Sequence, residues 1–495
     1  MTAPTEADDL APKAFEVYDA ELEAELASGK TPLVIKLLVA ATFVVILNET
    51  ITVNAIPKLA DHFDITLASA GWVTTVFMLT MAALIPLTGW FLQRVSTRTA
   101  YASAMIAFTT GTVVAAAAPT FGFLLAGRVI QASGTAVMMP LLMTTLMTVV
   151  LPQDRGRVMG QVTLAMSVAP AMGPAVSGLV LQTGNWRMIF VVVLPIAAVV
   201  GFSGYRLLEN IGEPKKSSVS WISVVLAALG FGSLVYGLNK VGHAKWTEPT
   251  GIIAVGVVLV TLFVLNQLRL QRSGTPLLDL RTLKHPTYAK SLILMAAAFL
   301  GFFGSMILLP GYLQNLRGLS ALQSGLVVMP GGLAMGLLGP RVGKVFDRLG
   351  SRPLVIPGAV GMVAMLLLLS QIGTGTSFWL IIPIHVVLMS CLAAIFTPVF
   401  SLGLGDLPQQ LYSHGSSLLG TLQQVSGAIG AALLLVIQSN RATSLAQSGH
   451  SPADSFVGGF EAALLTSAAL GLVVVVMSLL LPARPTQVEG APQGH

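Results

Sequence analysis

Two stretches of this sequence repeat one another: Gly89-Trp-Phe-Leu-Gln93-Arg94-Val-Ser-Thr-Arg98 and Gly343-Lys-Val-Phe-Asp347-Arg348-Leu-Gly-Ser-Arg352. The glycines and both arginines align at a constant offset of 254 residues. Glycine allows two helices to approach closely, while arginine can bond the carbonyls at a helix end or a carboxylate. Each copy joins two long apolar segments, so the repeat predicts two related helical bundles.

The composition is that of a membrane protein. Of the 495 residues, 54% are hydrophobic and only 10% are charged, whereas an average soluble domain has about 25% charged residues. Apolar segments of about 20 residues, long enough to cross the core of a bilayer, recur along the chain. We predict an all-α polytopic protein with fourteen transmembrane helices, at residues 32–54, 68–92, 99–118, 121–150, 157–182, 187–208, 219–239, 250–268, 287–313, 321–342, 353–373, 377–404, 414–438 and 459–481.

The repeat and the apolar segments together predict the domain organisation. Each copy of the repeat lies between the second and third segments of a block of six, and two segments are inserted between the blocks. Duplicated six-helix halves are typical of transporters with a binding site at the mid-membrane interface. We therefore expect a cytoplasmic N-terminal segment, a six-helix bundle, a linker with two additional transmembrane helices, a second six-helix bundle and a disordered cytoplasmic tail, at residues 1–30, 31–210, 211–272, 273–481 and 482–495.

Basic residues in the short loops indicate the orientation. If the N-terminus is cytoplasmic, 20 of the 27 lysines and arginines lie on the cytoplasmic side and 6 lie outside. The positive-inside rule favours this arrangement, and it explains the net charge of +6 without a nucleic-acid partner. Both copies of the repeat then lie on the cytoplasmic side as a candidate gate, unless their arginines only anchor the loops. The expected gate residues are Gly89, Arg94, Arg98, Gly343, Asp347, Arg348 and Arg352.

Glu49 lies inside the first predicted span, where a carboxylate is costly unless it pairs, faces water or takes a proton. Arg128 lies in the fourth span at a similar depth, about 12 Å below the external surface by the rise of an α-helix. Equal depth predicts an ion pair, because each buried charge favours a partner. We expect Glu49 to bind and release a proton beside Arg128. The alternative is a permanent salt bridge that only orients two helices.

The fifth predicted span carries a group of prolines and glycines that predicts either a hinge or a packing kink. These residues are Pro170, Gly173, Pro174 and Gly178. Other spans supply methionine, aromatic and polar residues suited to an adaptable cavity, although lipid contact or core packing is the alternative for each. The candidate cavity residues are Asn48, Asn54, Trp72, Phe77, Met78, Gln131, Met138, Met139, Phe302, Phe303, Met306, His385 and Gln423. For His385, and likewise for Gln423 and Gln424 of the thirteenth predicted span, the alternative is a satisfied interhelical hydrogen bond.

Other chemistries find little support in the sequence. A single cysteine, Cys391, excludes an internal disulfide, and no histidine and cysteine spacing predicts a metal site. The chain lacks a GxxxxGK[ST] loop, so nothing points to ATP as a driver. We expect no cofactor and a proton gradient as the driving force. An intramembrane enzyme would need a convergent group of catalytic residues, and a lone buried glutamate provides too little.

Several motifs resemble the major facilitator superfamily, and specifically its fourteen-span drug:proton antiporter family. The second repeat matches the superfamily's GxxxDRxGxR signature, whereas in the first repeat Gln93 stands where an acid is usual. Arg128-Val-Ile-Gln131-Ala-Ser-Gly134 is similar to the family's RxxQGxG motif, and residues 169–178 are similar to its antiporter motif. Leu47-Asn48-Glu49-Thr50 is similar to the first-span motif, but its acid is displaced by one position, a turn of about 100° around the helix. A group of lincomycin-type exporters in this family resembles this Asn-Glu-Thr form.

The resemblance extends from the first predicted span to the last. It implies a multi-pass protein of the bacterial plasma membrane that exports amphipathic or cationic small molecules, antibiotics among them, in exchange for protons by alternating access. Its partners would be the small-molecule cargo, protons and the lipid bilayer, and nothing requires more than a monomer. Glu49 would be the main coupling site, with Arg128 as its partner. The alternative on the same fold is an exporter of an endogenous metabolite, siderophore, amino acid or lipid.

Overall fold

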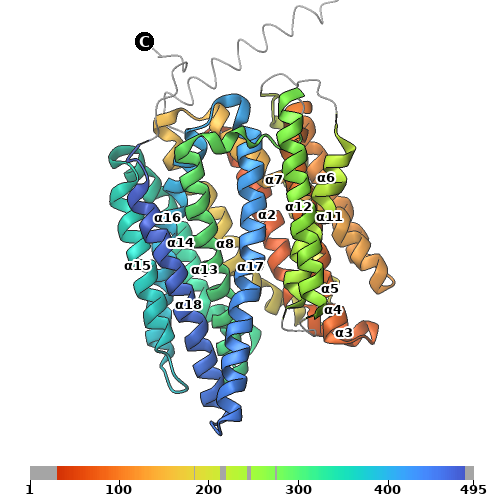
Figure 1. Cartoon of the computed structure of the whole chain (residues 1–495). Coiled ribbons are helices and arrows are strands. Elements are labelled where there is room, and N and C mark those ends of the chain that lie inside the picture. The colour runs from red at the N-terminus through yellow and green to blue at the C-terminus, as the bar shows by residue number, and fades with distance from the viewer. Residues whose placement is uncertain (1–30, 183, 212–218, 242–246, 274–275, 485–495) are drawn as a thin grey trace, which may run out of the picture.

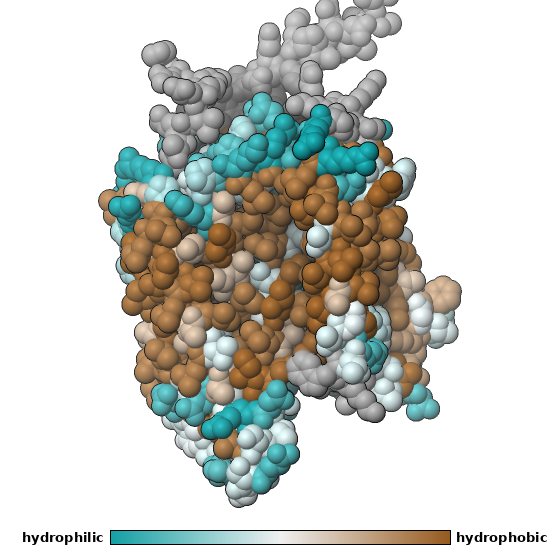
Figure 2. Space-filling view, in the orientation of Figure 1, coloured by the Kyte–Doolittle hydropathy of each residue, from teal (hydrophilic) through white to brown (hydrophobic). Residues whose placement is uncertain are grey.

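The computed structural model describes residues 31–182, 184–211, 219–241, 247–273 and 276–484. In this part of the chain, fourteen helices are long and apolar enough to cross a membrane, which confirms the predicted spans. Figure 2 shows the apolar side chains as a broad band between two hydrophilic ends. The predicted segment 1–30 and residues 485–495 of the predicted tail lie outside the described residues.

The first bundle consists of six long helices. They are α2 (Leu33–Val53), α5 (Trp72–Arg94), α6 (Thr97–Ala116), α7 (Phe121–Val149), α8 (Arg155–Leu181) and α10 (Val193–Leu207). Shorter elements connect them, namely α3 (Ile56–Phe63), α4 (Leu67–Ala70), α9 (Met188–Val191) and a 3-10 turn at Pro152–Asp154. The chain leaves α2 and starts again as α3 with Pro57 in the first turn, where a proline is tolerated.

The second bundle repeats this plan. Its helices are α13 (Pro286–Gly311), α14 (Ala321–Leu349), α15 (Arg352–Ser370), α16 (Phe378–Gly405), α17 (Tyr412–Gln447) and α18 (Pro452–Leu480). A π-helical turn at Tyr312–Leu316 follows α13, and 3-10 turns at Leu280–Lys284 and Gln409–Leu411 precede α13 and α17. The start of α14 is fixed by a capping box between Ser320 and Gln323. In Figure 1 this bundle occupies the left of the molecule, from green through teal to blue.

Both ends of the described chain lie at the same end of the molecule. Near the start, Gln161 Nε2 donates to Thr31 Oγ1 at 2.8 Å, and near the finish the Ser351 amide donates to the Ala483 carbonyl at 2.7 Å. We call this end, which also holds the start of α8 and the loop between α14 and α15, the basic end. It is the upper end in Figure 1. That it faces the cytoplasm stays a prediction.

The two bundles meet along two seams. The first seam joins α8 to α14, and the second joins α5 to α17. At the basic end of the first seam, a Cβ added to Gly343 would lie 1.9 Å from the Gly156 carbonyl oxygen, so only glycine fits there. The contact continues to the other end of both helices, where a Cβ on Gly178 would lie 3.2 Å from Leu322 Cβ. Small residues thus hold these two helices together over their whole length.

The inserted pair, α11 (Trp221–Lys240) and α12 (Thr247–Ser273), covers the second seam. Both α5 and α17 contact α11, and Ala82 of α5 and Ala428 of α17 share one apolar cluster with Phe231 of α11. The ring of Phe231 packs edge-on against Phe263 of α12, with centroids 5.9 Å apart. Helix α11 therefore contacts both bundles alongside the second seam.

The connection from α12 to α13 is tied down by polar contacts. Gln267 Oε1 accepts hydrogen bonds from the Leu277 and Leu278 amides at 2.8 and 3.2 Å. Next to them, Arg281 Nε and Nη2 both donate to Asp279 Oδ2, at 2.8 and 2.5 Å. Burial alone would raise the pKa of Asp279, but hydrogen bonds from the side chain and backbone of Arg281 hold it below its ordinary value. These contacts hold the start of the connection against the end of α12.

Candidate functional site

A cavity of about 280 Å³ lies between the two bundles. Four helices of the first bundle (α2, α5, α7 and α8) and four of the second (α13, α14, α16 and α17) contribute to its wall. This is where duplicated six-helix transporters place their binding site. The cavity therefore becomes the candidate functional site.

Methionine and phenylalanine side chains form most of the apolar wall. The predicted residues Met138, Met139, Phe302 and Met306 line it, whereas the side chain of Phe303 lies outside the described residues. Sequence reasoning missed other members of the same kind, because methionine in a span faces lipid or core as readily as a cavity. These are Met81, Met166, Met335, Met389, Phe299, Phe396 and Phe400. The Phe299 and Phe396 rings stack at 4.7 Å between centroids.

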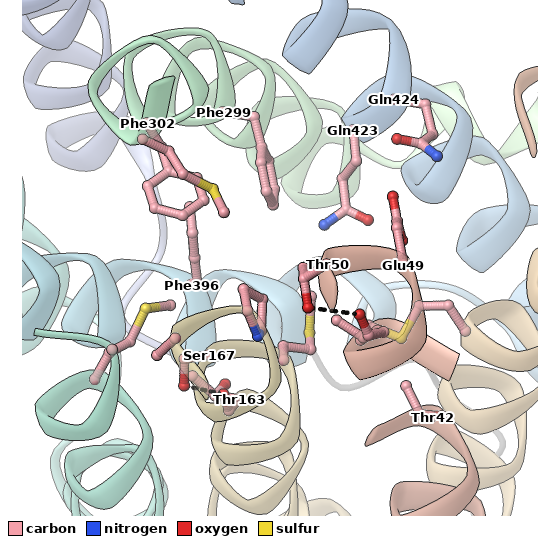
Figure 3. Close-up of a pocket in the computed structure, with 18 of the residues that line it drawn as sticks. Thr42, Glu49, Thr50, Thr163, Ser167, Phe299, Phe302, Phe396, Gln423 and Gln424 are labelled. Carbon is pink, nitrogen blue, oxygen red and sulfur yellow. Dashed lines mark hydrogen bonds between the residues drawn. The ribbon is translucent and has the colours of Figure 1, made fainter. Parts of the chain in front are cut away.

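A few polar side chains break this apolar wall. Among the described lining residues, Glu49 is the only carboxylate, and it is partly exposed to the cavity. Figure 3 shows it pointing from α2 toward Gln423 and Gln424 of α17. Gln423 was predicted to line the cavity and does so, and Gln424 joins it. A carboxylate and two amides from opposite bundles thus face one another.

Arg128 is fully buried, but its partners differ from the prediction. Its Nη1 donates to Gln131 Oε1 at 2.5 Å and to Asn48 Oδ1 at 3.2 Å, while its Nε donates to the Val73 carbonyl at 3.2 Å. The guanidinium lies 4.1 Å from the centre of the Phe77 ring. None of the ion pairs between described residues involves Glu49, so the predicted ion pair is wrong for this structure.

The reason for this error is the rotation along α2. Equal depth placed Glu49 and Arg128 at one level, but adjacent residues of a helix point about 100° apart. Asn48 therefore faces Arg128 in α7, while Glu49 faces the cavity. The two charges still act on each other without direct contact.

Several predicted cavity residues lie outside the lining. Asn48, Gln131 and Phe77 surround Arg128, and Gln131 is itself held by Thr112 Oγ1 at 2.7 Å. The side-chain oxygens of Asn48 and Gln131 both accept from the buried Arg128 charge, while Asn48 Nδ2 has no partner among the described residues.

Three further predictions for the cavity also fail. Asn54 donates to the Pro174 carbonyl of α8 at 3.3 Å. Trp72 packs on Tyr236 of α11 with ring centroids 5.5 Å apart, and Met78 is absent from the lining. These residues lie on the spans that form the cavity, but on other faces of their helices.

The proline and glycine group of α8 packs against two neighbouring helices. Pro170 lines the cavity, and a Cβ on Gly173 would lie 2.4 Å from Thr50 Oγ1 of α2. On the other side, Pro174 contacts α14, where a Cβ on Gly325 would lie 2.8 Å from the Pro174 ring. The helix runs unbroken from Arg155 to Leu181 through both prolines. In this structure the group forms a tight packing face between α2 and α14.

At the basic end, the second repeat closes the first seam. Asp347 of α14 accepts hydrogen bonds from the Gly156 amide at 2.8 Å and from the Arg157 amide at 2.7 Å. These amides belong to the first turn of α8, where free N–H groups favour a carboxylate. Gly343 and Asp347 thus join the two bundles at this end, and their role as a gate stays a prediction.

The first repeat closes the second seam differently. Gln93 Nε2 donates to the Gln410 carbonyl at 2.9 Å, and a Cβ on Gly89 would lie 2.8 Å from His414 Nδ1. The first repeat has no acid at position 93, and the side-chain amide of Gln93 joins the two bundles there instead.

The arginines of the repeats make other contacts. Arg98 Nε donates to the Tyr205 carbonyl of α10 at 2.7 Å, within its own bundle, and Arg94 lies over the Trp90 ring. In the second repeat, the Arg348 carbonyl accepts from Arg484 Nη2 at 3.0 Å, and Arg352 begins α15. The contact of Arg98 agrees with the alternative that the arginines anchor the loops.

Comparison with known proteins agrees with this architecture. The model of the Major Facilitator Superfamily matches residues 38–431, which is most of the chain. The chain belongs to this superfamily. It is 37% identical over 453 residues to a lincomycin resistance protein of Listeria monocytogenes, with 91% of this chain and 95% of that protein covered. It is 35% identical over 462 residues to an uncharacterized MFS-type transporter of Bacillus subtilis, covering 92% of this chain and 97% of that one.

Solved structures and a more distant relative extend the comparison. A multidrug resistance protein B homolog of Mycobacterium tuberculosis is 29% identical over 391 residues, which cover 76% of this chain and 70% of that one. A proton:xylose symporter matches with a TM-score of 0.64 at 15% identity, over 91% of this chain and 95% of that one, and it shares the fold. The superfamily member described here is thus a multi-pass bacterial membrane protein of a transporter family.

Proposed function

We propose that this protein exports amphipathic or cationic small molecules from the bacterial cell in exchange for protons. The observation that carries the proposal is Glu49, the single carboxylate among the described lining residues, in a methionine and phenylalanine cavity between the two bundles. Relatives named for lincomycin resistance and multidrug resistance support a drug as the cargo.

The cavity suits such cargo chemically. Flexible methionine side chains adapt to ligands of different shape, and phenylalanine faces attract both apolar groups and cations. Polar groups are few, so binding depends mostly on burial of apolar surface and little on a fixed hydrogen-bond pattern. Glu49 supplies the one negative charge among the described lining residues, which attracts a cationic amine.

Glu49 is the proposed coupling site. In its ionised form the carboxylate attracts cargo, and in its protonated form it carries a proton in place of cargo. The two therefore compete for one group, which is the simplest basis for exchange. Arg128 supports this competition through its charge at a distance, while Asn48 and Gln131 hold the guanidinium in place. The driving force is the proton gradient, with no cofactor.

Alternating access would use the two seams. We place the basic end in the cytoplasm because of the positive-inside rule. Separation of Asp347 from α8 and of Gln93 from Gln410 would then open the cavity to the cytoplasm. A single chain contains both bundles and the whole cavity wall, which supports a monomer as the transporting unit.

The test is transport by the purified full-length protein in liposomes with an acidic interior. Wild-type protein should accumulate lincomycin or tetraphenylphosphonium against its gradient as protons leave. Glu49→Gln should reduce this accumulation by about tenfold or more, because its side chain cannot carry a proton, while downhill exchange of cargo continues. The matched control is Glu461→Gln on α18, outside the cavity, which should accumulate cargo normally. Undiminished accumulation by Glu49→Gln would exclude the coupling role.

A further inference from the structure

His385 is the remaining ionisable residue of the cavity wall. It lies seven residues after the start of α16 in the second bundle, on a different helix and bundle from Glu49, and is only 5% exposed. Its ring packs directly on Gly331 of α14, where an added Cβ would lie 2.4 Å from Cδ2 and 2.8 Å from Nε2. The glycine therefore makes room for the ring and limits its movement.

Neither nitrogen of His385 has a hydrogen-bond partner within the described part of the chain. The interhelical bond that the sequence allowed is thus missing. A neutral imidazole offers one donor and one acceptor, and leaving both unused in a buried position costs free energy. Buried polar groups without partners are rare in native proteins, so this one requires a physical explanation.

Two hydroxyls of α8 that line the cavity, those of Thr163 and Ser167, already make hydrogen bonds within the protein. Thr163 shares a hydrogen bond with Thr397 across the bundles at 2.8 Å, and Ser167 donates to the Thr163 carbonyl at 2.6 Å. Figure 3 shows Ser167 and Thr163 together on α8, away from Glu49 and the two glutamines. On this side of the cavity, His385 is therefore the group whose donor and acceptor both lack a protein partner. Both nitrogens are shielded in this structure, so a ligand pairs with them only after flexible neighbouring side chains of the wall move aside.

We propose that His385 is a hydrogen-bonding subsite that selects cargo carrying a hydroxyl or amide group in addition to its cationic centre. The inference rests on the proposed function, because it assigns a second recognition point to the same cavity. The cationic centre lies with Glu49, Gln423 and Gln424, and the polar group of the cargo pairs with His385. The methionine and phenylalanine wall accepts the apolar part.

The test compares two ligands that differ by one hydroxyl: ethyldimethylphenylammonium and its 3-hydroxyphenyl derivative. Their binding to the detergent-purified full-length protein is measured by competition with radiolabelled tetraphenylphosphonium. Wild-type protein should bind the hydroxylated ion about fivefold to tenfold more tightly, the ratio expected for one buried hydrogen bond. His385→Phe should bring the ratio close to one, whereas His385→Gln, which keeps a donor and an acceptor, should retain part of the preference.

Each outcome tests the His385 subsite, the proposed proton coupling, or both. The control is His450→Phe, at an exposed position between α17 and α18. It should leave the ratio of the two ligand affinities as in wild type. A wild-type ratio near one, or a preference that survives His385→Phe, would overturn the subsite and leave water as the partner of the imidazole. If the ions bind with the expected preference but no proton-driven transport is found, the coupling fails and the subsite stands. If wild-type protein binds neither ion, the cargo class and the subsite are both rejected.

Discussion

The two seams between the bundles come from the same repeat, yet they are built differently. In the first seam, α8 and α14 touch from Gly156 and Gly343 at one end to Gly178 and Leu322 at the other. In the second seam, α5 and α17 meet near the basic end, where Ser417 Oγ donates to the Ile85 carbonyl at 2.6 Å, and α11 bridges them farther along. The first seam is a continuous contact between two helices. At the second seam a third helix, α11, packs against both partners.

The polar contacts differ in the same way. Asp347 and Gln93 occupy equivalent positions of the repeat, and their partners, Gly156 and Gln410, are also 254 residues apart. In the first seam a carboxylate accepts from backbone amides, and in the second a side-chain amide donates to a backbone carbonyl. Duplication thus preserved the position of the contact while the direction of its hydrogen bonds changed. The comparison predicts that substitutions in the first seam destabilise the protein more than equivalent substitutions in the second.

The largest expected effect is at the first seam. Gly343→Ala places a methyl group 1.9 Å from the Gly156 carbonyl oxygen, so the helices must separate. We expect a loss of about 3 kcal/mol in stability, or no folded protein. Thermal unfolding of the purified protein measures it. The matched control is Gly232→Ala on α11, where nothing lies within 4 Å of the added carbon, and it should be neutral or slightly stabilising. Equal melting temperatures for the two variants would contradict the close contact.

A smaller effect is expected for the polar contacts. Asp347→Asn removes the charge at the first turn of α8 and one of two acceptors, which should cost about 1–2 kcal/mol. Gln93→Ala removes one exposed neutral hydrogen bond and should cost about 0.5 kcal/mol. Melting temperatures of both variants test the order. If Gln93→Ala proves the more damaging change, the second seam is the stronger of the two.

Of the two tightly packed glycines of the repeats, Gly89 should show the smaller effect. Gly89→Ala brings a methyl group 2.8 Å from His414 Nδ1, a side-chain atom that can move, so we expect a cost of about 1 kcal/mol. His414→Ala in the same chain should recover part of this loss. A double-mutant cycle of melting temperatures measures the coupling between the two positions. Additive losses would show that the ring of His414 is not the obstacle.

Most of the fold could be predicted from the sequence because apolar length and repeat spacing are local signals. Hydropathy located all fourteen spans, and the offset between Gly89 and Gly343 indicated the two bundles. The sequence also contains a signal for the first seam, namely the spacing of its glycines. Gly156 and Gly160 in α8, and Gly339 and Gly343 in α14, are each four residues apart, the spacing of close helix contacts in membranes.

The site was harder to predict because it depends on which way each helix faces. Depth along a span placed Glu49 and Arg128 at one level, but only the structure shows Asn48 turned toward Arg128. The same limit applies to Phe77 and Gln131, which support Arg128, and to Met335 and Met389, which line the cavity. Helices as uniformly apolar as α2 carry almost no periodic signal to fix their rotation.

The contact of Asp347 with α8 has a consequence for how easily the seam can open. Both partners lie at the end of the bundle, where water can replace each lost hydrogen bond. Exchanging a protein partner for water changes the free energy by only about 1 kcal/mol for each bond. The Asp347 carboxylate therefore fixes where the ends of α8 and α14 meet. Breaking its two hydrogen bonds would add little to the free-energy barrier to opening of the seam. In the proposed alternating-access cycle, the rate of opening would then depend on the glycine contacts deeper in the seam, such as that between Gly160 and Gly339, for which water offers no substitute.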